Sequence, residues 1–198
     1  MRCYNCGVFT LLGFCQHCLA ELGDFSLGSR SFFDEKRAEF FKVYYFYKYS
    51  SIKHLLHSKH KFYGYFVLRF LARLSFGRFE DFFRGENLPT INALPLDDRV
   101  KNALYSHSAI LARALKSKHI KPIFGALQAQ NELKYSGKSL SFRQKNKRKF
   151  KLLKPLKHPV ILVDDIITTG SSMLEARAIL EKKQISVLFG LVLADAKE

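Results

Sequence analysis

Runs of apolar residues recur along the chain at the lengths of buried strands, and the clearest run is Val160 to Val163. Consecutive aliphatic residues followed by polar ones are typical of a strand that is covered on both faces of a parallel sheet. The aromatic and β-branched segment 41–47 predicts a first strand, segment 91–96 a short strand, and segment 185–193 a further buried strand. We expect these strands to form one parallel sheet with right-handed crossovers.

Helical periodicity fills the stretches between these strands. Ser50 or Ser51 can cap a helix that runs through residue 57. Further helices are predicted at 63–74, 106–118 and 173–183. The apolar stripe of 63–74 consists of Phe66, Phe70 and Leu74, and that of 106–118 of Ile110, Leu111, Ala114 and Leu115. Strands that alternate with helices predict an α/β fold, a parallel sheet flanked by helices.

Length and composition suffice for one ordinary domain with its own core and a small accessory unit, because 47% of the 198 residues are hydrophobic. The formal net charge of +16 is far from the near-neutral balance of an ordinary metabolic enzyme. Such a charge indicates a polyanionic partner. Nucleic acid is the first candidate, and an anionic membrane surface is the second.

The sequence shows no secretory signal, because cysteines interrupt the apolar N-terminal residues and no small-residue cleavage site follows. The longest apolar segment, 63–74, carries Arg69 and Arg73 and is too short to span a bilayer. We therefore expect a cytoplasmic protein, and peripheral association with the inner membrane stays open.

All four cysteines of the chain lie near its N-terminus in two Cys-x2-Cys pairs, Cys3 with Cys6 and Cys15 with Cys18. Each pair can direct two thiolates at one ion, so this spacing predicts a tetrahedral Zn²⁺ site. Four thiolates close the coordination sphere, which makes the site structural. Two disulfides are the alternative, disfavoured in a cytoplasmic chain. His17 could also replace one thiolate as a ligand.

Two segments are strongly basic. Residues 40–79 contain no acidic side chain, and residues 134–157 contain ten Lys or Arg and no acid, which predicts an exposed, mobile loop. Cations interleaved with aromatic rings are what single-stranded nucleic acid binding uses, although most of these rings are expected in the core. The candidate DNA contacts are Lys42, Lys48, Lys53, Lys59, Lys61, Arg143, Lys145, Lys147, Arg148, Lys149 and Lys151.

A pair of acids and a hydroxyl-rich turn follow the strand at 160–163. The turn 168–172 precedes a helix, and N–H groups at a helix N-terminus attract phosphate. Asp164 and Asp165 would repel that phosphate unless they served another group of the same ligand, such as the vicinal hydroxyls of a sugar. The pattern therefore predicts a ribose 5-phosphate site. A strand–turn–helix corner with a capping hydroxyl is the structural alternative.

This stretch closely resembles the phosphoribosyl-diphosphate (PRPP) signature of the type I phosphoribosyltransferases. The resemblance implies that Asp164 and Asp165 hold the ribose hydroxyls and act in catalysis, and that Mg²⁺ accompanies PRPP. It also implies that the loop wraps the 5-phosphate and that Arg99, after the strand at 91–96, contacts pyrophosphate. The expected PRPP-binding residues are Asp164, Asp165, Ile166, Ile167, Thr168, Thr169, Gly170, Ser171, Ser172 and Arg99.

The order of a four-cysteine knuckle, a basic aromatic segment at 47–56 and the Asp-Asp-Ile-Ile-Thr-Thr-Gly motif resembles the ComF family over essentially the full length. That family comprises phosphoribosyltransferase-like proteins of bacterial competence. The chain departs from the family's Arg-Gly-Phe-Asn-Gln segment, where it has Ala-Leu-Tyr-Ser-His at 103–107. This departure touches the side that would hold pyrophosphate or an acceptor base, so binding of PRPP is better supported than turnover.

The resemblance implies a zinc knuckle at 1–22 and a phosphoribosyltransferase-like domain at 40–198, and the glycines, serines and mixed charge of residues 23–39 predict a connector between them. It also implies a PRPP-binding protein that handles single-stranded DNA during natural transformation, with DNA-uptake or recombination proteins as partners. A nucleobase or related phosphoribosyltransferase of the salvage type, with a structural zinc site, is the alternative. A PRPP-sensing transcriptional regulator is a third hypothesis, but the sequence shows no helix-turn-helix signature.

Overall fold

The computed structural model describes the chain except residues 62, 84–88, 97–98, 101–104, 132–147 and 198. A central sheet of six strands has the order β1-β2-β8-β7-β3-β4. Strand β1 is antiparallel to β2, and the other five strands are parallel to one another. The strands span Gly28–Asp34 (β1), Glu39–Lys48 (β2), Ile91–Pro95 (β3), Ile120–Pro122 (β4), Val160–Ile167 (β7) and Val187–Asp195 (β8).

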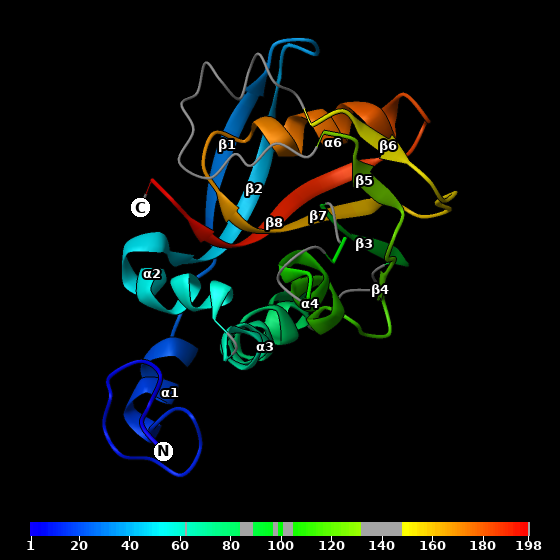
Figure 1. The fold of residues 1–198 in the computed structure, drawn as a ribbon. Coiled ribbons are helices and arrows are strands. Elements are labelled where there is room, and N and C mark those ends of the chain that lie inside the picture. The colour runs from blue at the N-terminus through cyan, green and yellow to red at the C-terminus, as the bar shows by residue number, and fades with distance from the viewer. Residues whose placement is uncertain (62, 84–88, 97–98, 101–104, 132–147, 198) are drawn as a thin grey trace.

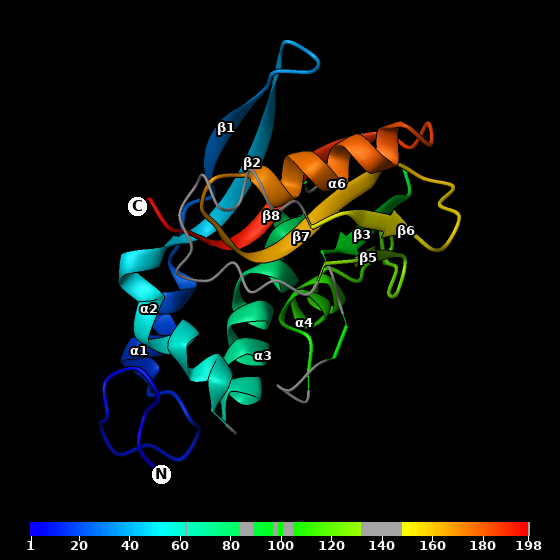
Figure 2. The same cartoon turned by 45° about the horizontal axis from the view of Figure 1, so that its top comes forward.

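Helices cover both faces of this sheet (Figures 1 and 2). Alternate residues of β7 face opposite layers, because side chains alternate along a strand. We call the face toward which Ile161 and Val163 point the first face, and the face toward which Val160 and Leu162 point the second face; each pair belongs to the hydrophobic core on its own side. On the first face lie α2 (Tyr49–His57), η1 (Ser58–His60), α3 (Gly64–Leu74), η2 (Phe76–Phe83) and α4 (His107–Ala114); on the second lie α6 (Ser171–Glu181) and the antiparallel ribbon of β5 (Leu127–Ala129) and β6 (Phe150–Leu152).

The N-terminal knuckle packs on the first-face helices. It ends in helix α1 (Gln16–Gly23), and its buried residues belong to the first-face core. The ring of Phe14 stacks on that of Phe70 of α3, with the centroids 4.1 Å apart, and Tyr4 stacks on Tyr63 at 5.4 Å. The knuckle therefore shares a core with the larger part of the chain.

The predicted strands at 41–47, 91–96, 160–163 and 185–193 are confirmed as β2, β3, β7 and β8. Three details differ from the sequence reading. Strand β7 continues through both acids to Ile167, because residues as far as 167 pair with β8. Segment 23–39, expected to be a connector, contains edge strand β1. Segment 134–157, expected to be an exposed loop, contains β6 with Phe150 buried, and its residues up to 147 lie outside the described chain.

The predicted stripe of α3 is confirmed in part, because Phe70 and Leu74 pack against the first-face core. Val67, Leu68 and Leu71 are buried, whereas Phe66 is 60% exposed. Several apolar residues of this helix have compatible spacings, and packing against α4, η2 and η1 determines which of them are buried. Helix α4 starts after the capping residue Ser106 and ends at Ala114, four residues short of the predicted end.

Candidate functional site

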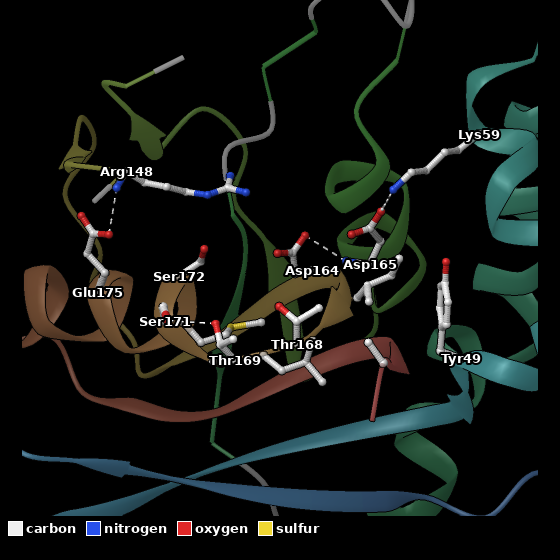
Figure 3. Close-up of a pocket in the computed structure, with 15 residues that line it drawn as sticks. Tyr49, Lys59, Arg148, Asp164, Asp165, Thr168, Thr169, Ser171, Ser172 and Glu175 are labelled. Carbon is white, nitrogen blue, oxygen red and sulfur yellow. Dashed lines mark hydrogen bonds and ion pairs between the residues drawn. The ribbon is translucent and has the colours of Figure 1, made fainter. Parts of the chain in front are cut away.

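A pocket of about 370 Å³ lies at the carboxyl end of β7 (Figure 3). Strand β3 lies between β4 and β7 in the sheet. The chain adds β4 on one side of β3 and then crosses to add β7 on the other side, so the direction in which strands are added reverses between β3 and β7. Ligands of open α/β sheets bind at such a switch point, outside the carboxyl ends of the strands. The pocket is lined by Tyr49, Lys59, Arg148, Asp164, Asp165, Ile166, Ile167, Thr168, Thr169, Gly170, Ser171, Ser172, Met173, Glu175 and Ala196.

The two adjacent acids have different surroundings. Lys59 Nζ donates to Asp165 Oδ2 at 2.9 Å, and His107 Nδ1 lies 3.9 Å from the same oxygen. Asp164 Oδ1 accepts the backbone N–H of Asp165 at 2.9 Å. Figure 3 shows that Lys59 approaches Asp165 on the side that faces away from Asp164. Asp165 is thus held by an ion pair within the protein.

These surroundings shift the two carboxyl groups in opposite directions. Burial, together with the neighbouring Asp165 carboxylate, raises the pKa of Asp164 to about 7. Burial also opposes ionisation of Asp165, but the Lys59 ammonium outweighs it and lowers the pKa of that carboxyl. At neutral pH Asp165 is therefore ionised, and Asp164 can accept or release a proton.

The turn after β7 presents backbone donors to the pocket. Gly170 is the N-cap of α6, and the N–H groups of residues 171–173 form its first turn, where no intrahelical acceptor is available. The hydroxyls of Thr169 and Ser171 lie 2.9 Å apart and hydrogen-bond to each other. Donors at a helix N-terminus and hydroxyls on one turn can together bind an anion.

Gly170 is required at its position for two reasons. Its φ of 72° lies in the left-handed region, which glycine adopts without strain. A Cβ atom there would also lie 2.4 Å from Cδ1 of Phe32 on β1. Strand β1 therefore supports the turn from the side, a role that the sequence did not indicate.

Glu175 in α6 holds the backbone of two basic residues, Arg148 and Lys149, beside the pocket. Its carboxylate accepts the backbone N–H of Arg148 at 3.0 Å and that of Lys149 at 2.6 Å. Figure 3 shows the Arg148 side chain extending over the pocket near Asp164 and Ser172. A carboxylate beside an anion site would be unfavourable, but here it serves to hold Arg148 in place.

All residues expected at 164–172 line this one pocket, and so do Lys59 and Arg148, which the sequence reading assigned to DNA. Arg99 is not among the described lining residues. Arg143, Lys145 and Lys147 lie outside the described residues. The remaining candidate DNA contacts are exposed away from the pocket: Lys42, Lys48, Lys53, Lys61, Lys149 and Lys151. Sequence reasoning missed Tyr49 and Glu175, and only contacts between distant segments identify them.

The four cysteines converge at the N-terminus as their spacing predicts. Their sulfur atoms all lie within 4.8 Å of one another, and none forms a disulfide. Cys3 and Cys18 are buried, and Cys6 is exposed. Asn5 Nδ2 donates to Cys18 Sγ at 3.3 Å, and the Cys15 N–H donates to Cys3 Sγ at 3.4 Å. This cluster could hold a metal ion such as zinc.

The surroundings of two of these thiols shift their pKa values in opposite directions. Burial raises the pKa of Cys3, but backbone hydrogen bonds outweigh burial and lower it to about 6. At Cys18 the Asn5 amide lowers the pKa, whereas burial and the neighbouring thiols together raise it to about 12. Four thiolates so close together repel one another unless a divalent ion neutralises them, and zinc accepts four such ligands.

Among the residues that the structure describes, no helix has the length and apolarity needed to cross a membrane. No family model matches this chain, and no curated protein matches it at a significant level.

Proposed function

We propose that this chain binds PRPP in the pocket at the end of β7 and that it handles single-stranded DNA during natural transformation, as its resemblance to the ComF family implies. The observation that carries the proposal is that two acids and a hydroxyl-rich helix N-terminus, adjacent in sequence, line one pocket of about 370 Å³ at the sheet's switch point.

The chemistry of the pocket is suited to both ends of a ribose 5-phosphate. The turn at 168–172 offers donors to a phosphate, and the carboxylates of Asp164 and Asp165 accept hydrogen bonds from hydroxyls. Of the two cations that line the pocket, Lys59 is paired with Asp165, whereas the Arg148 side chain extends over the pocket, where it can contact a phosphate (Figure 3). We propose that Mg²⁺ enters with PRPP, because carboxylate and phosphate oxygens are its preferred ligands.

The DNA part of the proposal is supported by charge. Six candidate lysines are exposed outside the pocket, and the chain as a whole carries +16. Two of these cations lie near aromatic rings, with Lys42 Nζ 5.8 Å from the centroid of Tyr44 and Lys61 Nζ 5.7 Å from that of Tyr63. A single strand can use such pairs for its phosphates and its bases.

Calorimetric titration of the full-length protein with PRPP and Mg²⁺ tests the pocket. We expect saturable binding, and we expect Asp164→Asn and Asp165→Asn each to weaken it by roughly 10-fold or more, since a hydrogen bond to a charged group contributes about 1.5–3 kcal/mol. The exposed Asp24 provides the matched control, because Asp24→Asn makes the same chemical change outside the pocket. Wild-type protein that does not bind PRPP would contradict the proposal.

Gel-shift titrations with single- and double-stranded DNA over a salt series test the second part. We expect a preference for single strands and an affinity that falls steeply with salt, because phosphate contacts release counterions. The variant Lys42→Ala, Lys53→Ala should flatten the salt dependence. Release of pyrophosphate on addition of a free nucleobase, unaffected by DNA, would favour a salvage-type transferase instead.

A further inference from the structure

Strand β1 contacts the turn through Arg30, whose side chain is largely covered. The Arg30 guanidinium donates from Nη2 to the backbone carbonyl of Thr168 and from Nη1 to Asp195 Oδ1 at the end of β8. Asp195 is fully buried, and the guanidinium carbon lies 4.4 Å from the ring centroid of Phe32. Arg30 is therefore held on three sides, by a carboxylate, a carbonyl and an aromatic ring.

The bond to Thr168 determines the direction of the next N–H group. In a planar trans peptide the carbonyl of Thr168 and the N–H of Thr169 point to opposite sides. Thr168 and Thr169 line the pocket, whereas Arg30 does not. In Figure 3 the ribbons of β1 and β2 run below the turn, on the side away from Arg148. A carbonyl turned toward β1 thus leaves the Thr169 N–H turned toward the pocket.

We propose that Arg30 is a positioning residue for a phosphate monoester: it holds the Thr168 carbonyl away from the pocket, so that the Thr169 N–H is directed at the phosphate. This inference rests on the proposed function. Without the Arg30 bond the peptide could rotate, and a carbonyl oxygen would then face the anion and repel it.

The ion pair with Asp195 indicates that Arg30 acts through orientation and not through its charge. The carboxylate neutralises the guanidinium, and the Arg30 side chain is only 19% exposed. Asp195 also accepts the N–H of Lys197 at 3.0 Å, which fixes the carboxylate itself. A planar guanidinium can donate to a carboxylate and a carbonyl at once, and the shorter reach of a single ammonium matches that geometry less well.

Arg177 is a matched control, because it is another largely buried arginine in an ion-pair network. It donates from Nε to Glu181 at 2.9 Å and contacts Glu39, and it does not line the pocket. Loss of Arg30 leaves the buried Asp195 carboxylate without its guanidinium, and loss of Arg177 removes two ion pairs from its network, so both changes should lower stability. Only loss of Arg30 should change the backbone conformation of the turn 168–172, because Arg30 donates to the Thr168 carbonyl.

The test titrates ribose 5-phosphate into full-length ¹⁵N-labelled protein and follows affinity and backbone amide shifts. In the wild type we expect the Thr169 amide to move among the most and the Thr168 amide to move little. Arg30→Gln should weaken binding at least 10-fold and abolish the Thr169 response, Arg30→Lys should recover part of the affinity, and Arg177→Gln should stay within twofold of the wild type.

Two results would overturn the inference while leaving the proposed function in place. One is binding by Arg30→Gln within twofold of the wild type, and the other is a wild-type Thr169 amide that does not respond to ribose 5-phosphate. The second result needs no variant, so it decides the matter even if Arg30→Gln does not fold. Wild-type protein that binds neither ribose 5-phosphate nor PRPP would remove the proposed function and this inference together.

Discussion

At the scale of single residues, neighbouring groups of the same type are given different properties by their partners. Asp164 and Asp165 are adjacent on β7, but only Asp165 is paired with Lys59. The pKa of Asp165 is lowered, and that of Asp164 is raised to about 7. An unliganded pocket therefore stores an unfavourable charge on Asp164, which a ligand hydroxyl or a cation can relieve.

The two acids should consequently have opposite effects on stability. The folded-state pKa of Asp164 is above its unfolded value, so its contribution is greatest at low pH and is lost as pH rises through about 7. Asp164→Asn should thus stabilise the unliganded protein at pH 8 by about 1–2 kcal/mol and have little effect at pH 4, as measured by urea unfolding. Equal effects at both pH values would contradict the assignment.

Asp165→Asn is the control for that experiment. The folded-state pKa of the Asp165 carboxyl is lowered. The ionised carboxylate therefore contributes stability above its unfolded pKa, and this contribution is lost as pH falls through the folded-state pKa. The substitution should therefore destabilise the protein at pH 8, by about 1 kcal/mol or more, because Lys59 is left without its carboxylate.

At the scale of elements, packing decides which side of a helix is buried and which strand supports the site. Helix α3 buries Val67, Leu68 and Leu71, whereas Phe66 of the predicted stripe is exposed. Strand β1 lies at the edge of the sheet, yet it contacts the turn through Arg30 and lies against Gly170 through Phe32. A short antiparallel addition to a parallel sheet thereby supports the turn that we propose to bind a phosphate.

The orientation of α3 can be tested with two substitutions. Leu71 is fully buried, so Leu71→Ala should lower the free energy of unfolding by about 2–5 kcal/mol through lost burial and a cavity. Phe66 is largely exposed, and Phe66→Ala should cost about 0.5 kcal/mol or less. Denaturant unfolding of both variants measures the difference. A larger decrease in the free energy of unfolding for Phe66→Ala than for Leu71→Ala would contradict this orientation of the helix.

At the scale of the whole molecule, the knuckle and the pocket share the first-face helices. Asn5 Oδ1 contacts His54 Nε2 of α2 at 2.7 Å, and Tyr47 donates to the carbonyl of Leu22 at 2.7 Å. Tyr49 and Lys59, which precede and follow His54 in the sequence, line the pocket. The knuckle is therefore joined to the larger core by rings, hydrogen bonds and a common helix.

Metal removal should accordingly affect more than the N-terminus. We expect about one equivalent of zinc per chain, and we expect Cys15→Ser to lose it and to lower the melting temperature of the whole chain by several degrees, because the Phe14 and Tyr4 stacks on the first face would loosen. His17 is exposed next to the ligands, and His17→Ala should keep the metal. Full zinc in Cys15→Ser by elemental analysis would contradict the site.

Features encoded by neighbouring residues were determined by the sequence alone. Strands β2, β3, β7 and β8 follow from segments rich in apolar residues, and the cysteine cluster follows from pair spacing, because two knuckles need only a short loop to meet. The acids and the turn lie in one pocket for the same reason, since a strand end and the next helix N-terminus are adjacent by geometry.

Only the tertiary structure decided which distant residues complete the site. Lys59 is 106 positions from Asp165, and Arg30 is 165 positions from Asp195. In a chain with 33 Lys and Arg residues, composition could not separate these two from solvent-exposed cations. Burial next to a carboxylate made the selection, because a cation stays out of water only where a paired charge offsets its desolvation.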